Sequence, residues 1–337
     1  MNVFGKWKSI LVTLPGLAMF STGASAHVKW FVPPDNLSAA SQLPFELFST
    51  PVLSWLGIAV MLIGWSVFLD SRFPVLPILE KVRQEYLMYL LKLCTGLSLL
   101  MSAYSGVIFA PHLIAPGGIG NIYLIIEAVV GLLLVFNFHI FAATILLLVL
   151  CFGMAINFGF VTTLEYMNMA GIASCLLLFH FHPEKYRIHL KAYSIASLRI
   201  LTGIALVSLG LSEKILNPDL GVYFVEDYQW NFMQNLGFTD FSNTLFVFSA
   251  GMMEVIFGII LILGTTTRVN ILIVSAFMFT SNLTFFVSGN YSEALMEIFG
   301  HLPFIATAMI LIFFGSGNKL KITDLWRQGP ADLDKFR

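Results

Sequence analysis

The chain alternates long apolar runs with short polar connections. A helix needs about 20 predominantly apolar residues to cross a bilayer, and runs of about that length recur along most of the sequence. We therefore predict an all-α integral membrane protein with about nine transmembrane helices and no large soluble domain. The apolar runs cover residues 51–69, 88–110, 121–137, 139–158, 166–181, 195–211, 244–264, 269–288 and 297–314.

The first 26 residues have the order of a secretory signal peptide. Lys6 and Lys8 precede an apolar segment at residues 10–20, and small residues ending in Ala-Ser-Ala come after it. Cleavage after Ala26 would make His27 the first residue of the mature chain. Because a signal peptide directs the adjoining chain across the membrane, we expect residues 27–50 to lie outside the cytoplasm.

Basic residues are distributed unevenly over the connections between the predicted spans. If the first span enters from outside, the outer loops contain only Lys29 and Lys214, while cytoplasmic loops carry the other loop lysines and arginines, as the positive-inside rule requires. We predict a bacterial inner-membrane protein with a periplasmic mature N-terminus and a cytoplasmic C-terminus. The predicted cytoplasmic residues are Arg72, Lys81, Arg83, Lys185, Arg187, Lys191, Arg268, Lys319, Lys321, Arg327, Lys335 and Arg337.

The amino-acid composition agrees with a membrane protein and argues against a nucleic-acid-binding protein. Hydrophobic residues make up 58% of the chain and charged residues 11%, with a net charge of -1. No basic stripe is available to neutralise phosphates, so nucleic acid is not an expected partner. The three cysteines are far apart inside apolar runs, and the sequence lacks nucleotide-binding and hydrolase motifs.

Three segments of the first half match three segments of the second half in the same order. The matches are LLKLCTGLSLL (90–100) with SLRILTGIALV (197–207), IEAVVGLLLVF (126–136) with MEVIFGIILIL (253–263), and LEYMNMAGIA (164–173) with MEIFGHLPFIA (296–306). They pair Lys92 with Arg199, Glu127 with Glu254, Gly131 with Gly258, and Glu165 with Glu297. Each copy has four predicted spans, so we expect two parallel repeats, with the span at 51–69 outside them.

These patterns divide the chain into six parts. The predicted parts are a cleaved signal peptide (1–26), an extracytoplasmic segment (27–50), an extra span with a cytoplasmic loop (51–86), a first repeat (87–193), a second repeat (194–318) and a cytoplasmic tail (319–337).

The second repeat resembles the DoxX family of four-helix membrane proteins. The resemblance depends on LRILTGIALVSLGLSEKI, on MEVIFGIILILGTTTRV and on GSGNKLKITD after the last span; the first repeat is a weaker match. Members of this broad family are associated with quinone-linked oxidation of sulfur compounds and with membrane oxidoreductase complexes. The resemblance implies a fold more strongly than a reaction.

Four charged residues fall well inside predicted spans, beyond their first or last residue. Burying Glu254 near the middle of its span is costly unless the carboxylate is paired, and we predict Arg199 as its partner. Lys92 and Glu127 are expected to pair similarly in the first repeat. Such pairs could relay protons or bind a quinone head group, or they could only fix the helix register. The glycines one turn after the two acids are expected to allow close helix packing.

Three histidines fall on the predicted outer face: His27, His112 and His301. A terminal amine and an imidazole on His27, completed by one or both of the other imidazoles, would form a nitrogen-rich site that favours Cu(II). Glu165, Glu297 and Asp35 could support it as acceptors or oxygen ligands. The competing interpretation is that these histidines have only local structural roles.

The function these features favour is a quinone- or redox-associated membrane subunit, with copper at the outer-face histidines as an added hypothesis. Its expected partners are the lipid bilayer and a membrane oxidoreductase complex or an extracytoplasmic protein. The alternatives are a copper-handling protein without redox turnover, a small-molecule transporter with a path to Glu254, and a scaffold subunit whose partner holds the active centre.

Overall fold

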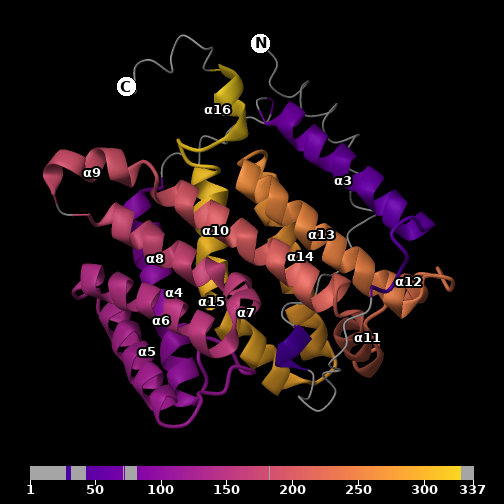
Figure 1. Ribbon diagram of the computed structural model, residues 1–337, viewed down its shortest axis with the longest axis horizontal. Coiled ribbons are helices and arrows are strands. Elements are labelled where there is room, and N and C mark those ends of the chain that lie inside the picture. Colours follow the sequence, from indigo (N-terminus) through magenta and orange to yellow (C-terminus); the bar gives the residue numbers. More distant parts are fainter. Residues whose placement is uncertain (1–27, 32–42, 71, 73–81, 182, 328–337) are drawn as a thin grey trace.

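The computed structural model describes residues 28–31, 43–70, 72, 82–181 and 183–327 (Figure 1). The predicted signal peptide, His27 and Asp35 lie outside the described residues. The elements are η1 (Val28–Trp30), α3 (Thr50–Leu69), α4 (Gln84–Tyr104), α5 (Ile119–Val135), α6 (Ile140–Phe158), α7 (Phe160–Glu165), α8 (Met167–Phe179), α9 (Glu184–Lys191), α10 (Ser194–Leu209), η4 (Gly210–Ile215), α11 (Pro218–Asp227), α12 (Phe232–Asn235), α13 (Asn243–Leu263), α14 (Thr267–Val287), α15 (Tyr291–Phe314) and α16 (Ile322–Arg327).

The chain is an all-α membrane protein, as the apolar pattern predicts. The described residues contain no strand, and each of the nine predicted spans coincides with a helix. Seven helices in the described part are long and apolar enough to cross a membrane, whereas α5 and α8 are apolar but shorter. The count of nine membrane crossings therefore stays a prediction.

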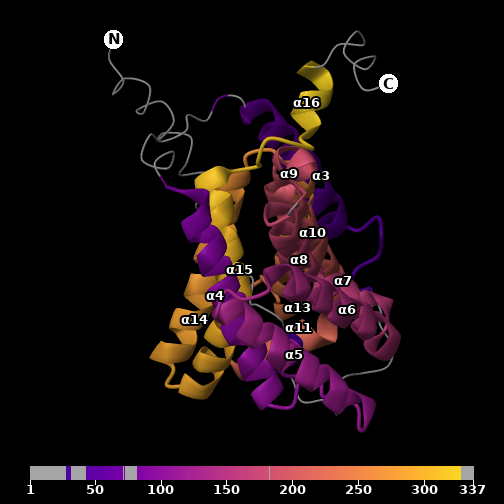
Figure 2. The same cartoon turned by 90° about the vertical axis from the view of Figure 1, so that its left-hand side faces the viewer.

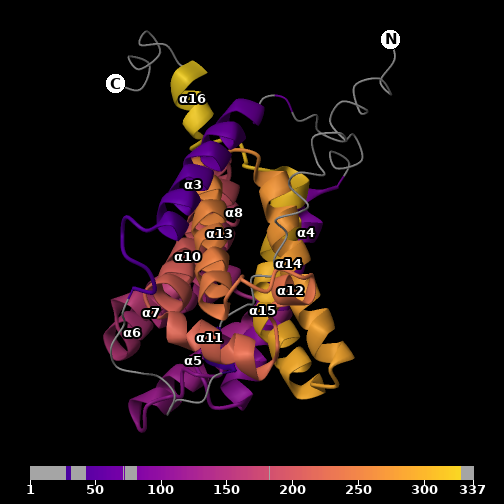
Figure 3. The ribbon, with the colours of Figure 1, turned by 90° about the vertical axis from the view of Figure 1, so that its right-hand side faces the viewer.

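The helices form two layers that face each other (Figures 2 and 3). One layer contains α8, α10 and α13, with α10 packed against both neighbours, and α3 covers α13. The other contains α4, α14 and α15, with α15 packed against both neighbours. Each layer therefore combines helices from both halves of the sequence: α8 of the first half packs on α10, and α15 of the second half packs on α4.

Paired glycines bring helix backbones close together in both halves. A Cβ on Gly96 would lie 2.7 Å from the carbonyl oxygen of Gly131, and a Cβ on Gly203 would lie 2.6 Å from that of Gly258. Backbones this close leave no room for any side chain at the crossing. The prediction that Gly131 and Gly258 allow close packing is confirmed, and it holds for both α4 with α5 and α10 with α13.

Loops predicted to be cytoplasmic meet at one end of the molecule, where Figure 1 shows α9 and α16. Asp70, after α3, accepts hydrogen bonds from the Thr266 amide at 2.9 Å and from the Thr323 hydroxyl at 3.3 Å. Arg199 donates to the Leu320 carbonyl at 2.7 Å. The loops thus sort by end as the charge pattern requires. The compartment that each end faces stays a prediction.

Candidate functional site

Glu254 pairs with Lys214, not with Arg199. The Lys214 Nζ lies 2.9 Å from each carboxylate oxygen of Glu254, and both residues are buried. The predicted Arg199 pair is wrong because the antiparallel crossing of α10 and α13 sets Gly203 against Gly258. That register places Arg199 beside Ile262, eight residues from Glu254, or about 12 Å along a helix with a rise of 1.5 Å per residue.

Arg199 instead closes the end of α13. Its guanidinium donates to the carbonyl oxygens of Leu261 and Ile262, and the chain leaves the helix at Gly264, whose φ is +76°. The last carbonyls of a helix have no intrahelical donors, and a cation there also interacts favourably with the helix dipole. Arg199 therefore has a structural role at this helix end, far from the carboxylate of Glu254.

The predicted pair of Lys92 with Glu127 is wrong for the same geometric reason. The contact of Gly96 with Gly131 places Lys92 level with Val135, eight residues from Glu127. Lys92 donates to the Asn137 side chain and lies 3.5 Å from Nε2 of His180. Glu127 is fully buried and accepts a 3.0 Å hydrogen bond from the Phe109 amide.

A π-helical turn, η4, presents three consecutive polar residues to the interior. Ser212 donates to Glu165, Glu213 accepts from the Val28 amide at 2.8 Å, and Lys214 binds Glu254. The three side chains reach partners on three different elements, and single π turns occur frequently at functional sites. No helical periodicity in the sequence indicates this turn, which explains why the sequence places Lys214 only in an outer loop.

The short N-terminal element η1 docks against two buried acids. Lys29 Nζ lies 2.6 Å from Glu165 and 3.7 Å from Glu213, and its side chain remains 19% exposed. Burial and the neighbouring charge of Glu213 raise the pKa of Glu165, whereas Lys29 lowers it. Glu165, which the sequence suggested as a support for the histidine site, thus binds Lys29 together with Glu213, a residue that the sequence analysis did not single out.

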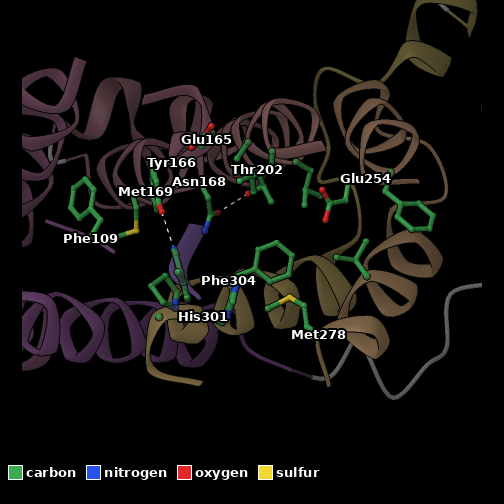
Figure 4. A pocket seen from close by; sticks show the side chains of 18 of the residues that line it. Phe109, Glu165, Tyr166, Asn168, Met169, Thr202, Glu254, Met278, His301 and Phe304 are labelled. Carbon is green, nitrogen blue, oxygen red and sulfur yellow. Dashed lines mark hydrogen bonds between the residues drawn. The ribbon is translucent and has the colours of Figure 1, made fainter. Parts of the chain in front are cut away.

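A cavity of about 100 Å³ lies between the two helix layers (Figure 4). Figure 4 shows Glu254 at one side of it and Tyr166 and His301 at another, and Lys214 and Trp30 also line it. Apolar side chains from α13, α14 and α15 make up much of the remaining wall. Asn168 and Thr202, joined by a 2.8 Å hydrogen bond, contribute a polar strip. The cavity thus combines an ion pair, a phenol and an imidazole with an apolar lining.

The two described outer-face histidines lie on either side of an aromatic pair. The Trp30 indole donates to the Tyr166 hydroxyl at 3.1 Å; the ring centroid of His301 is 4.8 Å from that of Trp30, and that of His112 is 6.2 Å from that of Tyr166. His301 Nδ1 lies 2.8 Å from the Glu297 carbonyl oxygen, which can only accept, so this nitrogen carries a proton.

The described residues alone do not assemble a metal site. Among them, no three side chains of histidine, cysteine, aspartate or glutamate are placed to hold a metal ion. His27, the residue on which the copper hypothesis depends, lies outside the described residues. A nitrogen-rich site at this face would therefore need His27 in addition to the other two histidines.

Comparison with known proteins identifies one segment. Residues 194–288 match the sequence model of the DoxX family, over α10 to the end of α14. No curated protein and no solved structure matches the chain. The matched segment contains Lys214 and Glu254 but not Trp30, Tyr166 or His301, which complete the cavity. The chain is therefore a helical membrane protein that carries a DoxX family domain over residues 194–288.

Proposed function

We propose that the chain is a redox-associated membrane subunit that binds a quinone-type head group in the cavity between its two helix layers. The observation that carries this proposal is the composition of the cavity wall: the Lys214–Glu254 ion pair and the polar groups of Tyr166 and His301 face an otherwise largely apolar space. Small-molecule sites commonly have this combination of an apolar lining with a few convergent polar groups.

The polar groups suit the chemistry of a quinone. A quinone takes up two electrons and two protons to become a quinol, and its carbonyl oxygens accept hydrogen bonds. Lys214 can donate to a carbonyl oxygen, and Glu254, held beside that ammonium, can exchange a proton with it. The electrons would come from a membrane oxidoreductase complex or an extracytoplasmic redox protein.

The lining also suits a ligand that comes from the bilayer. Val274, Phe277 and Met278 of α14 border the cavity, while the neighbouring Leu272 and Phe279 of the same helix are exposed on the outside. A single helix thus separates the cavity from the lipid. At about 100 Å³ the cavity accommodates a small ring, and an isoprenoid tail would have to leave beside α14.

A binding titration tests the proposal. Full-length protein in lipid nanodiscs is titrated with a short-chain quinone, and binding is followed by calorimetry. We expect saturable binding that Ala205→Leu abolishes, because Ala205 is a buried residue in the cavity wall. Gly57→Leu is the matched control, since no atom lies within 4 Å of a Cβ at that position on α3. Absence of saturable binding to the wild-type protein would refute the proposal.

Copper at the same face is a second candidate, favoured by the anchoring of Val28. Its amide is bound to Glu213, and Trp30 two residues later contacts His301. Cleavage after Ala26 would therefore start the mature chain one residue before this fixed point. His27 would then supply an amine and an imidazole, and His301 a further imidazole, a donor set that suits Cu(II), while His112 lies on the far side of Tyr166.

Measuring the copper content of the purified protein tests the copper proposal. Protein purified from copper-supplemented cells is expected to hold about one copper per chain and to lose it in His27→Ala and His301→Ala. His139→Ala is the control, because His139 is exposed between α5 and α6. N-terminal sequencing that does not begin at His27, or metal-free wild-type protein, would contradict the copper proposal without affecting the quinone proposal.

We also propose that the two halves arose by duplication, which the equivalent glycine contacts in the two halves support.

We propose as well that the end of the molecule with α9 and α16 faces the cytoplasm, because the lysine- and arginine-rich loops contact one another there. Impermeant labelling of intact cells should reach Leu236→Cys, in an exposed loop, and not Tyr186→Cys, on exposed α9. The reverse result would invert the orientation.

A further inference from the structure

Four residues near the start of the described chain lie against the interior of the protein. Val28 and Trp30 are buried, whereas Lys29 between them is partly exposed. Phe31 packs among Phe224, Tyr228 and Phe285. The segment Val28–Phe31 thus lies between the outer surface and the cavity, with Val28, Trp30 and Phe31 directed inward.

Trp30 occupies a notch that only glycine can form. A Cβ on Gly300 would lie 2.3 Å from the indole carbon Cη2 of Trp30, closer than any real contact. Gly300 is inside α15, where glycine is unfavourable relative to alanine because it loses more conformational freedom on folding. The indole also packs on His301 and donates to Tyr166. The fit of Trp30 gives a physical reason for glycine at position 300.

Polar contacts fix the same segment from the other side. Glu213 accepts from the Val28 amide, and Glu165 binds the Lys29 ammonium. Both acids are almost completely buried, and buried carboxylates are costly unless they are paired or hydrogen-bonded. They come from η4 and α7, while the notch comes from α15, so three separate elements form one receptor for the segment.

We propose that Val28–Phe31 is an intramolecular ligand whose Trp30 side chain seals the cavity against the aqueous phase at this face. The receptor takes a short peptide with a basic residue followed by tryptophan. Sealing keeps water away from the Lys214–Glu254 pair and leaves the side of α14 as the route for a ligand. This inference is independent of the quinone proposal, since it concerns access to the cavity whatever the cavity binds.

Thiol labelling tests the seal in the full-length chain. Ala205→Cys places a thiol in the cavity wall, and a water-soluble maleimide is added to protein in nanodiscs. We expect Trp30→Ala to raise the labelling rate at least tenfold, and added indole to reverse the increase by refilling the vacated space. An unchanged labelling rate in Trp30→Ala would overturn the proposal.

Two controls distinguish opening of the seal from unfolding. The chain without the Ala205→Cys change gives the background from its own cysteines. A second reporter, Thr144→Cys, lies at a fully buried position on α6 outside the cavity wall and must stay protected in Trp30→Ala. Labelling of Thr144→Cys together with Ala205→Cys would show general loosening and would count against a local seal.

A pair of size changes tests the notch itself. Gly300→Leu should displace the indole and raise labelling of Ala205→Cys, as Trp30→Ala does. In the double variant Trp30→Ala/Gly300→Leu, the leucine should fill the empty space, so labelling falls below that of either single variant. Labelling that increases multiplicatively when the two changes are combined would mean that Trp30 and Gly300 act separately and would contradict the proposal.

Discussion

The two halves place a carboxylate at the same position and use it differently. Glu127 and Glu254 each precede, by one turn, a glycine that contacts the helix before it. Glu254 binds the ammonium of Lys214 and borders the cavity, whereas Glu127 accepts from the backbone amide of Phe109. The same glycine register is found at the helix crossing of both halves, whereas the partner of the acid comes from the residues that follow α4 in one half and α10 in the other.

One difference between the two aligned segments accompanies this contrast. By the offset that relates Lys92 to Arg199, the position of Lys214 corresponds to Val107. The first half therefore has no ammonium at this point, and its backbone turns at Phe109, which has a φ of 62°, to offer an amide instead. Both halves have the glycine packing arrangement, and the second half also has a charge pair beside a cavity.

The largest expected effect is the loss of Lys214. Lys214→Met keeps most of the side-chain volume but removes the cation from a buried carboxylate, and breaking a buried pair in this way costs about 3–5 kcal/mol. Denaturant unfolding in mixed micelles measures the change. The double variant Lys214→Met/Glu254→Leu should recover most of the lost stability. A loss below about 1 kcal/mol would mean that the pair is not an important buried interaction.

The glycine crossings should respond alike in the two halves. Gly96→Ala and Gly203→Ala each force a Cβ against a backbone carbonyl, and overpacking of this kind typically costs about 1–3 kcal/mol. The same unfolding measurement compares them with Gly57→Ala, where nothing lies within 4 Å and no loss is expected. A large loss in one half and none in the other would show that the two crossings are not equivalent.

The smallest effect is expected at Glu127. Glu127→Gln keeps an oxygen that can accept from the Phe109 amide, so the free energy of unfolding should change by less than about 1 kcal/mol. Glu254→Gln should cost more, because it leaves the buried Lys214 ammonium facing a neutral amide. Equal losses in the two variants would remove the distinction between the acids.

The sequence predicts the helices well because each apolar run of membrane-spanning length has one physical solution. Hydrogen bonds must be satisfied within the segment, and a helix does so. The sorting of loops by end and the glycine contacts were predictable for similar reasons, since basic residues and small residues have direct local signatures.

The partners of the charged residues were not predictable, because they depend on helix register. Pairing Glu254 with Arg199 required only that the two lie on neighbouring helices, but the glycine contact offsets them by about two turns. The π turn that brings Ser212, Glu213 and Lys214 inward leaves no periodic signal. The docking of Trp30 was also hidden, because a three-residue element between the predicted cleavage site and two prolines looks like an ordinary loop.

Photo-crosslinking tests most directly the claim that the cavity beside Lys214 and Glu254 is a ligand site. A quinone carrying a photoreactive group on its ring is irradiated with the full-length protein in nanodiscs, and labelled residues are identified by mass spectrometry. We predict adducts on Met169, Met278 or Phe304, which line the cavity, and their loss in Ala205→Leu. Adducts confined to lipid-facing residues of α3 or α6, unchanged by Ala205→Leu, would contradict the account.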